Sequence, residues 1–283
     1  MKIFESVSEL RSMLEVVKRP VGLVPTMGSL HEGHLALVRR ARTENETLVV
    51  SVFVNPSQFE RDEDLESYPR NIDADIDILE KVGVDAIFTP SVAEMYPNGF
   101  DTIVNAGEIA ERLEGEFRPS HFNGVATIVC KLISIVKPNH AYFGQKDAQQ
   151  GVVVSRINTD LGLGAEIVMV PTVRDSDGLA LSSRNARLSP PERKAANVLY
   201  KSLLLAKNLE TPDAKTIRSQ MRLLIGKEPL ARVEYVSISD PCTLKEVHMI
   251  EGSALVSLAV WVGNTRLIDN KTLHLGCQTK TYT

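Results

Sequence analysis

The stretch VPTMGSLHEGHLALV, residues 24–38, indicates how this chain folds and where it binds a ligand. It opens with the end of an apolar run that closes at Pro25 and Thr26, which is typical of a buried strand. After His34, apolar residues at 35, 37 and 38 follow the spacing of a helix. The stretch therefore predicts a strand-to-helix turn, and such a turn exposes the N-terminus of the helix.

Two glycines and two histidines make this turn a candidate phosphate site. Free backbone N–H groups and the dipole at a helix N-terminus favour an anion, and Gly28 and Gly33 let a ligand approach the backbone. His31 and His34 lie three residues apart and project from one face of the helix. Two plainer interpretations stay open: both are ordinary surface or core histidines, or they form a zinc pair. The HxxH spacing is not the i, i+4 pair of zinc proteases, and neither Cys nor another His lies nearby in sequence.

The alternation of strand and helix continues through the first 176 residues. It predicts an α/β fold, a doubly wound parallel sheet of Rossmann-like type over residues 1–176, whose ligands sit at the carboxyl ends of strands. The apolar strand-like runs are 21–26, 48–54, 84–90, 140–144 and 165–171, and the helix-like stretches are 34–44, 71–82, 121–136 and 147–160.

Residues 177–283 follow a different pattern and predict a smaller α+β domain. A helix begins after Ser189, with Glu192 completing a capping box, and a second amphipathic helix ends at Gly226. Strands are expected in RVEYVSISD, ALVSLAVWVG and TRLIDN. The join VRDSDGLALSSRNARLSP is either a polar linker or a segment that closes over a ligand.

Composition narrows the class of protein. Hydrophobic residues make up 43% and charged residues 24%, as in ordinary soluble globular proteins, and the net charge of −4 argues against nucleic-acid or membrane-surface binding. The N-terminal stretch lacks the features of a signal peptide, and the apolar runs are too short to span a bilayer as a helix. The cysteines Cys130, Cys242 and Cys277 are odd in number and lack metal-ligand spacing, which predicts no disulfide framework and a cytoplasmic protein.

The histidine turn resembles the HIGH motif of the nucleotidylyltransferase superfamily, which binds ATP at the first strand-to-helix turn. Five further motifs resemble, in order, those of the pantothenate synthetase (pantoate–β-alanine ligase) family. They are FVNPSQF (53–59), YPR (68–70), LEGEFRPSHFNGV (113–125), YFGQKDAQQ (142–150) and LALSSRN (179–185). The resemblance runs from Met1 to about Asn270 and departs at Ser120, where the family usually has Gly, so a left-handed backbone there would be strained.

The resemblance implies the roles of individual residues. His31, His34, Lys146 and Arg184 would be catalytic, and Gln58 and Gln150 would bind pantoate, with Gln58 bordering the amine site. Many family members have Glu at the position of Gln145. The implied ATP site comprises Pro25, Met27, Gly28, Ser29, Leu30, His31, Glu32, Gly33, His34, Gly144, Gln145, Lys146, Asp147, Val173, Leu181, Ser182, Ser183 and Arg184.

These residue types also suit the chemistry on their own terms. Lys146 follows a strand, where its ammonium can meet a phosphate, and Asp147 is a candidate N-cap for the next helix. Arg184 can form forked bonds to phosphate oxygens, next to the hydroxyls of Ser182 and Ser183. Alternatively, Lys146 is a solvated surface lysine and the serines cap a turn.

The reaction implied is the ATP-dependent condensation of pantoate with β-alanine through pantoyl adenylate, with release of AMP and pyrophosphate. Neither step needs a protein nucleophile, and the sequence contains no GxSxG elbow. Positive charge from the two histidines, Lys146, Arg184 and a bound Mg²⁺ would stabilise the transition state, and the smaller domain would exclude water. The protein ligands of Mg²⁺ stay undefined. A homodimer is expected because family members are commonly dimers.

Three other functions remain open from the residues alone. A nucleotidyltransferase of the same superfamily would leave the nucleotide on its product, whereas the ligase releases free AMP. A non-catalytic adenine-nucleotide-binding module would retain the site without turnover. A metal-dependent hydrolase that uses the HxxH pair would lose activity with a zinc chelator.

Overall fold

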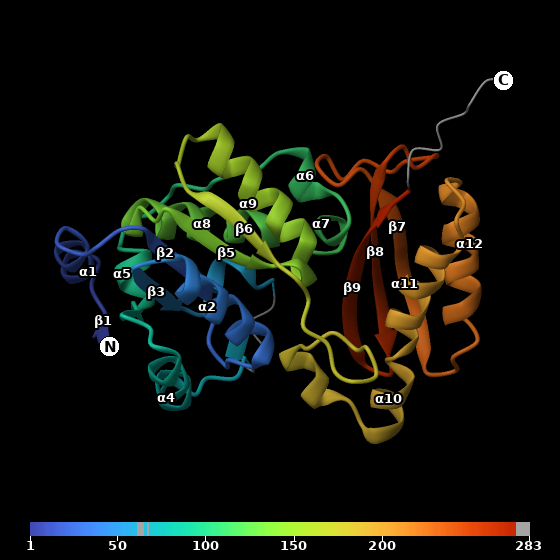
Figure 1. The fold of residues 1–283 in the computed structure, drawn as a ribbon, viewed down its shortest axis with the longest axis horizontal. Helices are drawn as coiled ribbons and strands as arrows, with labels where there is room; N and C mark the ends of the chain where they lie inside the picture. The colour runs from blue at the N-terminus through green and yellow to red at the C-terminus, as the bar shows by residue number, and fades with distance from the viewer. Residues whose placement is uncertain (61–64, 67, 276–283) are drawn as a thin grey trace. The chain divides into compact units, whose positions relative to one another are not determined.

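The computed structural model describes residues 1–60, 65–66 and 68–275. The chain divides into two compact units, Met1–Thr172 and Val173–Thr283 (Figure 1). Residues 173–176, expected in the first domain, thus belong to the second unit. Cys130 and Cys242 are free thiols, and Cys277 lies outside the described residues. No helix within the described ranges is long and apolar enough to cross a membrane.

The first unit is built on a six-stranded sheet in which every pairing is parallel. Its strand order is β1-β4-β3-β2-β5-β6. The chain moves outward from β2 to β3 and β4, then returns to the other side of β2 for β5 and β6, which is the doubly wound arrangement predicted. The strands are β1 (Lys2–Phe4), β2 (Val21–Thr26), β3 (Thr47–Val52), β4 (Ala86–Phe88), β5 (His140–Gly144) and β6 (Glu166–Val170).

The reversal between β2 and β5 fixes where a ligand can bind. These neighbouring strands run parallel, with Gly22 opposite His140 and Leu23 opposite Ala141, so their carboxyl ends lie at the same edge of the sheet. In doubly wound sheets, crossovers that leave neighbouring strands in opposite directions place their helices on opposite faces, and ligands bind beyond the carboxyl ends of the strands at such a point. The two turns singled out from the sequence follow these two strands.

Helices flank the sheet (Figure 1). One face is covered by α2, whose Leu37, Val38 and Ala41 pack with Val24 and Val50 of the sheet. The sequence analysis missed β1 and the helix α1 because both are short. The helices and 3-10 turns of this unit are α1 (Val7–Leu14), α2 (Glu32–Glu44), η1 (Pro56–Gln58), α4 (Ile72–Val82), α5 (Val92–Met95), α6 (Glu108–Glu111), α7 (Glu114–Phe117), α8 (His121–Val136), η2 (Gln145–Asp147) and α9 (Ala148–Asp160).

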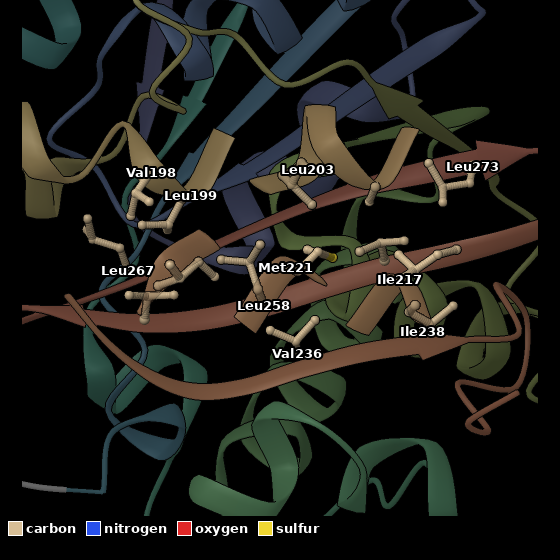
Figure 2. Packing of buried hydrophobic residues seen from close by; sticks show 14 of the residues in the cluster. Val198, Leu199, Leu203, Ile217, Met221, Val236, Ile238, Leu258, Leu267 and Leu273 are labelled. Carbon is tan, nitrogen blue, oxygen red and sulfur yellow. The ribbon is translucent and has the colours of Figure 1, made fainter. Parts of the chain in front are cut away.

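The second unit packs helices on a three-stranded antiparallel sheet. Figure 2 shows its core, in which Leu199 and Leu203 of α11 and Met221 of α12 face Val236 and Leu258 of the sheet. Its elements are η3 (Ser183–Arg187), α10 (Pro190–Ala195), α11 (Val198–Asn208), α12 (Ala214–Ile225), β7 (Ala231–Ser239), β8 (Ser253–Val262) and β9 (Thr265–His274).

The predicted capping box at the start of this unit's helices is confirmed, but the long helix expected there is not. The backbone N–H and the hydroxyl of Ser189 both donate to the Glu192 carboxylate. The helix then breaks at residues 196–197, so α10 and α11 are separate. Ala196 lies in the break and is itself fully buried, so the apolar pattern of the sequence gives no sign that the helix is interrupted there.

Candidate active site

The turn between β2 and α2 contains a capping box made by two histidines. His31 is the N-cap of α2, and its Nδ1 atom accepts the backbone N–H of Gly33 at 3.1 Å. The Nδ1 atom of His34 accepts the backbone N–H of His31 at 3.3 Å. The ring centroids lie 4.2 Å apart. Because each Nδ1 is an acceptor, each neutral ring carries its proton on Nε2, which is left as a donor.

Burial favours the neutral form of both imidazoles. Burial, followed by the charge of Lys146, lowers the pKa of His31. Burial, followed by the charge of His31, lowers the pKa of His34 to about 4. In the unliganded protein burial therefore favours the neutral form of both rings, and their expected role in stabilising the transition state stays a prediction. They offer N–H donors, because burial disfavours the charged form.

Three backbone N–H groups that precede α2 in this turn already have partners within the protein. Asp75 of α4 accepts the N–H of Ser29 and the N–H of Leu30, each at 2.8 Å. The N–H of Gly28 donates to the Thr26 hydroxyl at 3.2 Å. The carboxylate of Asp75, which is distant in sequence, therefore occupies the backbone donors of Ser29 and Leu30.

Asp75 was missed as a functional candidate, although the sequence contains a signal for it. In the sequence it shares the helical spacing of Ile72, Ile76 and Leu79, and in the structure Asp75 and Leu79 are the buried residues of α4. A carboxylate at such a position, 2% exposed, needs hydrogen-bond partners. The sequence could not say where those partners are.

Lys146 lies in η2, directly after β5, at the sheet edge that carries the histidine turn. Its side chain is 18% exposed, so it is not an ordinary solvated lysine, and it pairs with the Asp147 carboxylate at 3.4 Å. Its charge contributes to the lowered pKa of both histidines, which places the ammonium within electrostatic reach of them. Asp147 stands at the N-cap of α9, but its side chain makes no capping hydrogen bond.

Gln58, at the end of η1, contacts both Met27 of the histidine turn and the side-chain amide of Asn55. Its Nε2 donates to the Met27 sulfur at 3.0 Å, and its Oε1 accepts from Asn55 Nδ2 at 3.2 Å. Asn55 is 1% exposed and also holds Gly124 and Tyr96 through hydrogen bonds. The sequence analysis missed Asn55, although it lies in the FVNPSQF motif just after a strand.

Residues of the RPSHF motif hold the backbone of Gln58. The Gln58 carbonyl accepts from Arg118 Nη2 at 3.3 Å and faces His121 Nδ1 at 2.9 Å. Burial, followed by the charge of Arg118, lowers the pKa of His121 to about 4, so this ring is neutral and donates from Nδ1. Ser120 has φ −90° and ψ −14°. The strain considered for this residue is therefore absent.

Helix α8 packs directly against η1. A Cβ on Gly124 would lie 2.7 Å from the Gln58 nitrogen and would overlap the Ser57 carbonyl. Gly124 is thus required for close packing of the two elements, and its φ lies outside the left-handed region. Gln150, the other predicted pantoate ligand, is partly buried in the first turns of α9, four residues after Lys146.

Five of the predicted ATP-site residues belong to the second unit, namely Val173, Leu181, Ser182, Ser183 and Arg184. The N–H of Leu181 donates to the Val173 carbonyl at 3.0 Å. Ser182 caps η3 by accepting the Arg184 N–H at 3.3 Å. The preceding loop is held by Arg174, which forms two hydrogen bonds with Asp269, at 2.6 and 2.9 Å. LSSR is therefore an ordered part of this unit.

Comparison with known proteins decides between the functions left open. A family model described as pantoate-beta-alanine ligase matches residues 2–272. The chain belongs to the pantoate-beta-alanine ligase family. A pantothenate synthetase of Roseiflexus sp. is 50% identical over 273 residues, covering 95% of this chain and 98% of that protein. One from Thermotoga petrophila is 50% identical over 279 residues, covering 96% of this chain and 100% of that protein.

Solved structures of pantoate-beta-alanine ligases share the fold. Pantothenate synthetase from Thermus thermophilus superposes with a TM-score of 0.90 at 45% identity, covering 96% of this chain and 99% of that one. The ligase from Francisella tularensis, described as complexed with beta-gamma ATP and beta-alanine, has a TM-score of 0.79 at 34% identity. That match covers 96% of this chain and 97% of the other.

Proposed function

We propose that this chain joins pantoate to β-alanine at the expense of ATP, yielding pantothenate, AMP and pyrophosphate. The observation that carries the proposal is the contact between Gln58 and Met27. It joins Gln58, which is expected to bind pantoate, to Met27 of the turn that is expected to bind ATP. Two substrates held at one switch point are suitably placed for transfer between them.

In the first half-reaction a pantoate carboxylate oxygen attacks the α-phosphorus of ATP. The new O–P bond forms as the bond to the bridging oxygen breaks, and pyrophosphate leaves with the electron pair. Charge grows on the leaving phosphates, where the Nε2–H groups of His31 and His34 and the ammonium of Lys146 would stabilise it. Arg184 is proposed to join them from the second unit.

In the second half-reaction the neutral amine of β-alanine attacks the acyl carbon of pantoyl adenylate. The C–N bond forms, AMP leaves with the electron pair of the C–O bond, and the amine loses a proton. We propose that Gln58 and Gln150 hold pantoate through both steps, because amides can both donate to and accept from its hydroxyl and carboxylate groups. Closure of the second unit would protect the adenylate from water.

Mg²⁺ is proposed to enter with ATP. Within the described residues, no group of three or more His, Cys, Asp or Glu side chains is arranged to hold a metal ion. This fits a cation that binds mainly to substrate phosphates and retains several waters. When bound, it would neutralise phosphate charge. We also propose the homodimer and cytoplasmic location implied by the resemblance, and light scattering in solution tests the dimer.

Pyrophosphate exchange into ATP tests the function directly. With ATP, Mg²⁺ and labelled pyrophosphate, exchange should occur when pantoate is added and before any amine is present. Other carboxylic acids, tested in parallel, should support much less exchange. Addition of β-alanine should then release free AMP and form the amide. Exchange that strictly required β-alanine would refute the two-step route, and a product that retained the nucleotide would indicate a nucleotidyltransferase.

A further inference from the structure

The carboxylate of Asp75 holds the histidine turn from outside it. Asp75 lies on α4, about 45 residues beyond the turn, and is 2% exposed. Its Oδ2 accepts the Ser29 N–H and its Oδ1 accepts the Leu30 N–H, each at 2.8 Å. Two charge-assisted bonds to consecutive amides fix both the position and the orientation of this backbone segment.

The turn needs such support because its backbone is unfavourable. Gly28 has φ +80° and Ser29 has φ +54°. The left-handed conformation is unfavourable for a residue that carries a Cβ, as Ser29 does. A Cβ on Gly28 would lie 2.9 Å from Asp75 Oδ2, so the carboxylate and the backbone are in close approach. The local sequence alone does not favour this conformation, whereas the Asp75 bonds do.

The same bonds determine which groups remain for phosphate. Consecutive backbone amides often form an anion-binding nest, but here the amides of Ser29 and Leu30 already bind a carboxylate. The next residue, His31, begins the histidine capping box. The direction of its ring, and through its N–H that of the His34 ring, depends on the backbone that Asp75 holds.

We propose that Asp75 is a positioning residue for adenylate formation, which it supports by fixing the turn that orients the Nε2–H donors of His31 and His34. This inference rests on the proposed function. Asp75 acts through the backbone of Ser29 and Leu30 and does not touch the reacting atoms. Its loss should therefore impair the step in which charge develops on the leaving phosphates more than the transfer to the amine.

The test compares Asp75→Asn with Asp77→Asn, an equal loss of charge at an exposed position of the same helix. The Asn amide can accept one of the two N–H groups and opposes the other with its own N–H. Single-turnover adenylation should fall about 10²-fold in Asp75→Asn, the scale expected for a displacement of roughly 1 Å. Amide formation from preformed pantoyl adenylate should fall less than about threefold. Asp77→Asn should match the wild type in both assays.

A second measurement does not depend on activity. Nitrogen-15 spectra of the imidazoles report the tautomer, and at neutral pH the wild type should show Nε2–H for His31 and His34. Asp75→Asn should show mixed tautomers for both rings, while His121 stays unchanged. If Asp75→Asn does not fold, Asp75→Glu is used for both measurements, because it retains the charge but moves the carboxylate by one methylene.

Three results would overturn the inference. These are unchanged adenylation in a folded Asp75 variant, unchanged tautomers, or recovery of full rate at raised Mg²⁺, which would make Asp75 a cation ligand. Failure of the proposed function would look different. The wild-type protein would then show no pantoate-dependent pyrophosphate exchange, while the tautomers of His31 and His34 would still show whether Asp75 holds the turn.

Discussion

The Nδ1 atom of His34 accepts the backbone N–H of His31, and this bond determines the chemistry of both rings. It completes a capping box in which the His31 ring accepts the N–H of Gly33. With both Nδ1 atoms engaged as acceptors, the neutral rings can only donate from Nε2. A phosphate oxygen is a hydrogen-bond acceptor. The capping box therefore leaves each neutral ring with an Nε2–H donor for an anionic ligand, and neither ring has to carry a positive charge.

His34→Ala should lower the rate of adenylation more than it weakens ATP binding. A preorganised donor acts most strongly as charge develops, and removing one typically costs on the order of 10² to 10³ in rate. Single-turnover formation of pantoyl adenylate gives the rate, and calorimetric titration gives the ATP affinity. An unchanged single-turnover rate would make His34 a structural residue only.

Lys146→Ala should separate the two half-reactions. The ammonium is assigned to the phosphates of ATP, so adenylation should fall by roughly 10² to 10³. Amide formation from preformed adenylate should fall much less, because pyrophosphate has already left. Lys81→Ala, an exposed lysine at the end of α4, serves as the control and should leave both steps unchanged. Equal losses in both steps would instead mean that Lys146 holds the adenylate or the fold, and thermal melting separates these.

Gly124→Ala should weaken pantoate binding with little effect on ATP. The added methyl would overlap η1 and push Gln58 away from Met27 and Asn55. Loss of a hydrogen bond to a charged ligand costs about 1.5–3 kcal/mol, roughly a tenfold to hundredfold loss of affinity. Gln58→Ala should give a similar loss in calorimetric titrations. If Gly124→Ala weakens ATP to the same extent, η1 does not act specifically on pantoate.

The protein should lose stability as the pH falls from about 6.5 towards 4. Burial holds the pKa of His34 and of His121 at about 4 in the folded protein, well below the ordinary value of 6.5. In this pH window the unfolded chain binds protons that the folded chain does not, so stability present above pH 6.5 is lost on acidification. At pH 5 each histidine should have lowered the free energy of unfolding by roughly 1–2 kcal/mol relative to pH 7. Urea unfolding at pH 7 and 5 measures this, and a His121→Gln variant with an equally steep loss would contradict it.

Asp269→Asn should destabilise the second unit far more than Asp175→Asn. Asp269 is 1% exposed at its side chain and is held in a double hydrogen bond by Arg174, whereas Asp175 pairs with Arg193 at 40% exposure. Breaking a buried pair costs about 3–5 kcal/mol, while an exposed pair contributes about 0–1 kcal/mol. Thermal melts of the two variants give the comparison. Equal shifts in melting temperature would show that the buried pair has no special role in holding the loop before LSSR.

The sequence by itself determined the fold class of the first unit and predicted the strands from β2 to β6 together with a candidate site. Near-continuous apolar runs mark strands buried on both faces, and the turns after β2 and β5 carry the histidine and lysine motifs. Parallel strands direct such turns to one edge of the sheet, so both motifs were expected at that edge, while the strand order came from the structure. The motifs also indicated the family, which the comparisons confirmed.

Only the tertiary structure decided how the polar groups of the site are paired. Periodicity reports which face of a segment is buried, and so it could flag Asp75 as a carboxylate on an apolar stripe. It could not show that the partners are the amides of Ser29 and Leu30, or that two histidines share one capping box. The partner of a buried polar group is fixed by packing between segments distant in sequence, and the charge state of His34 depends on that packing because burial, not sequence position, sets its pKa.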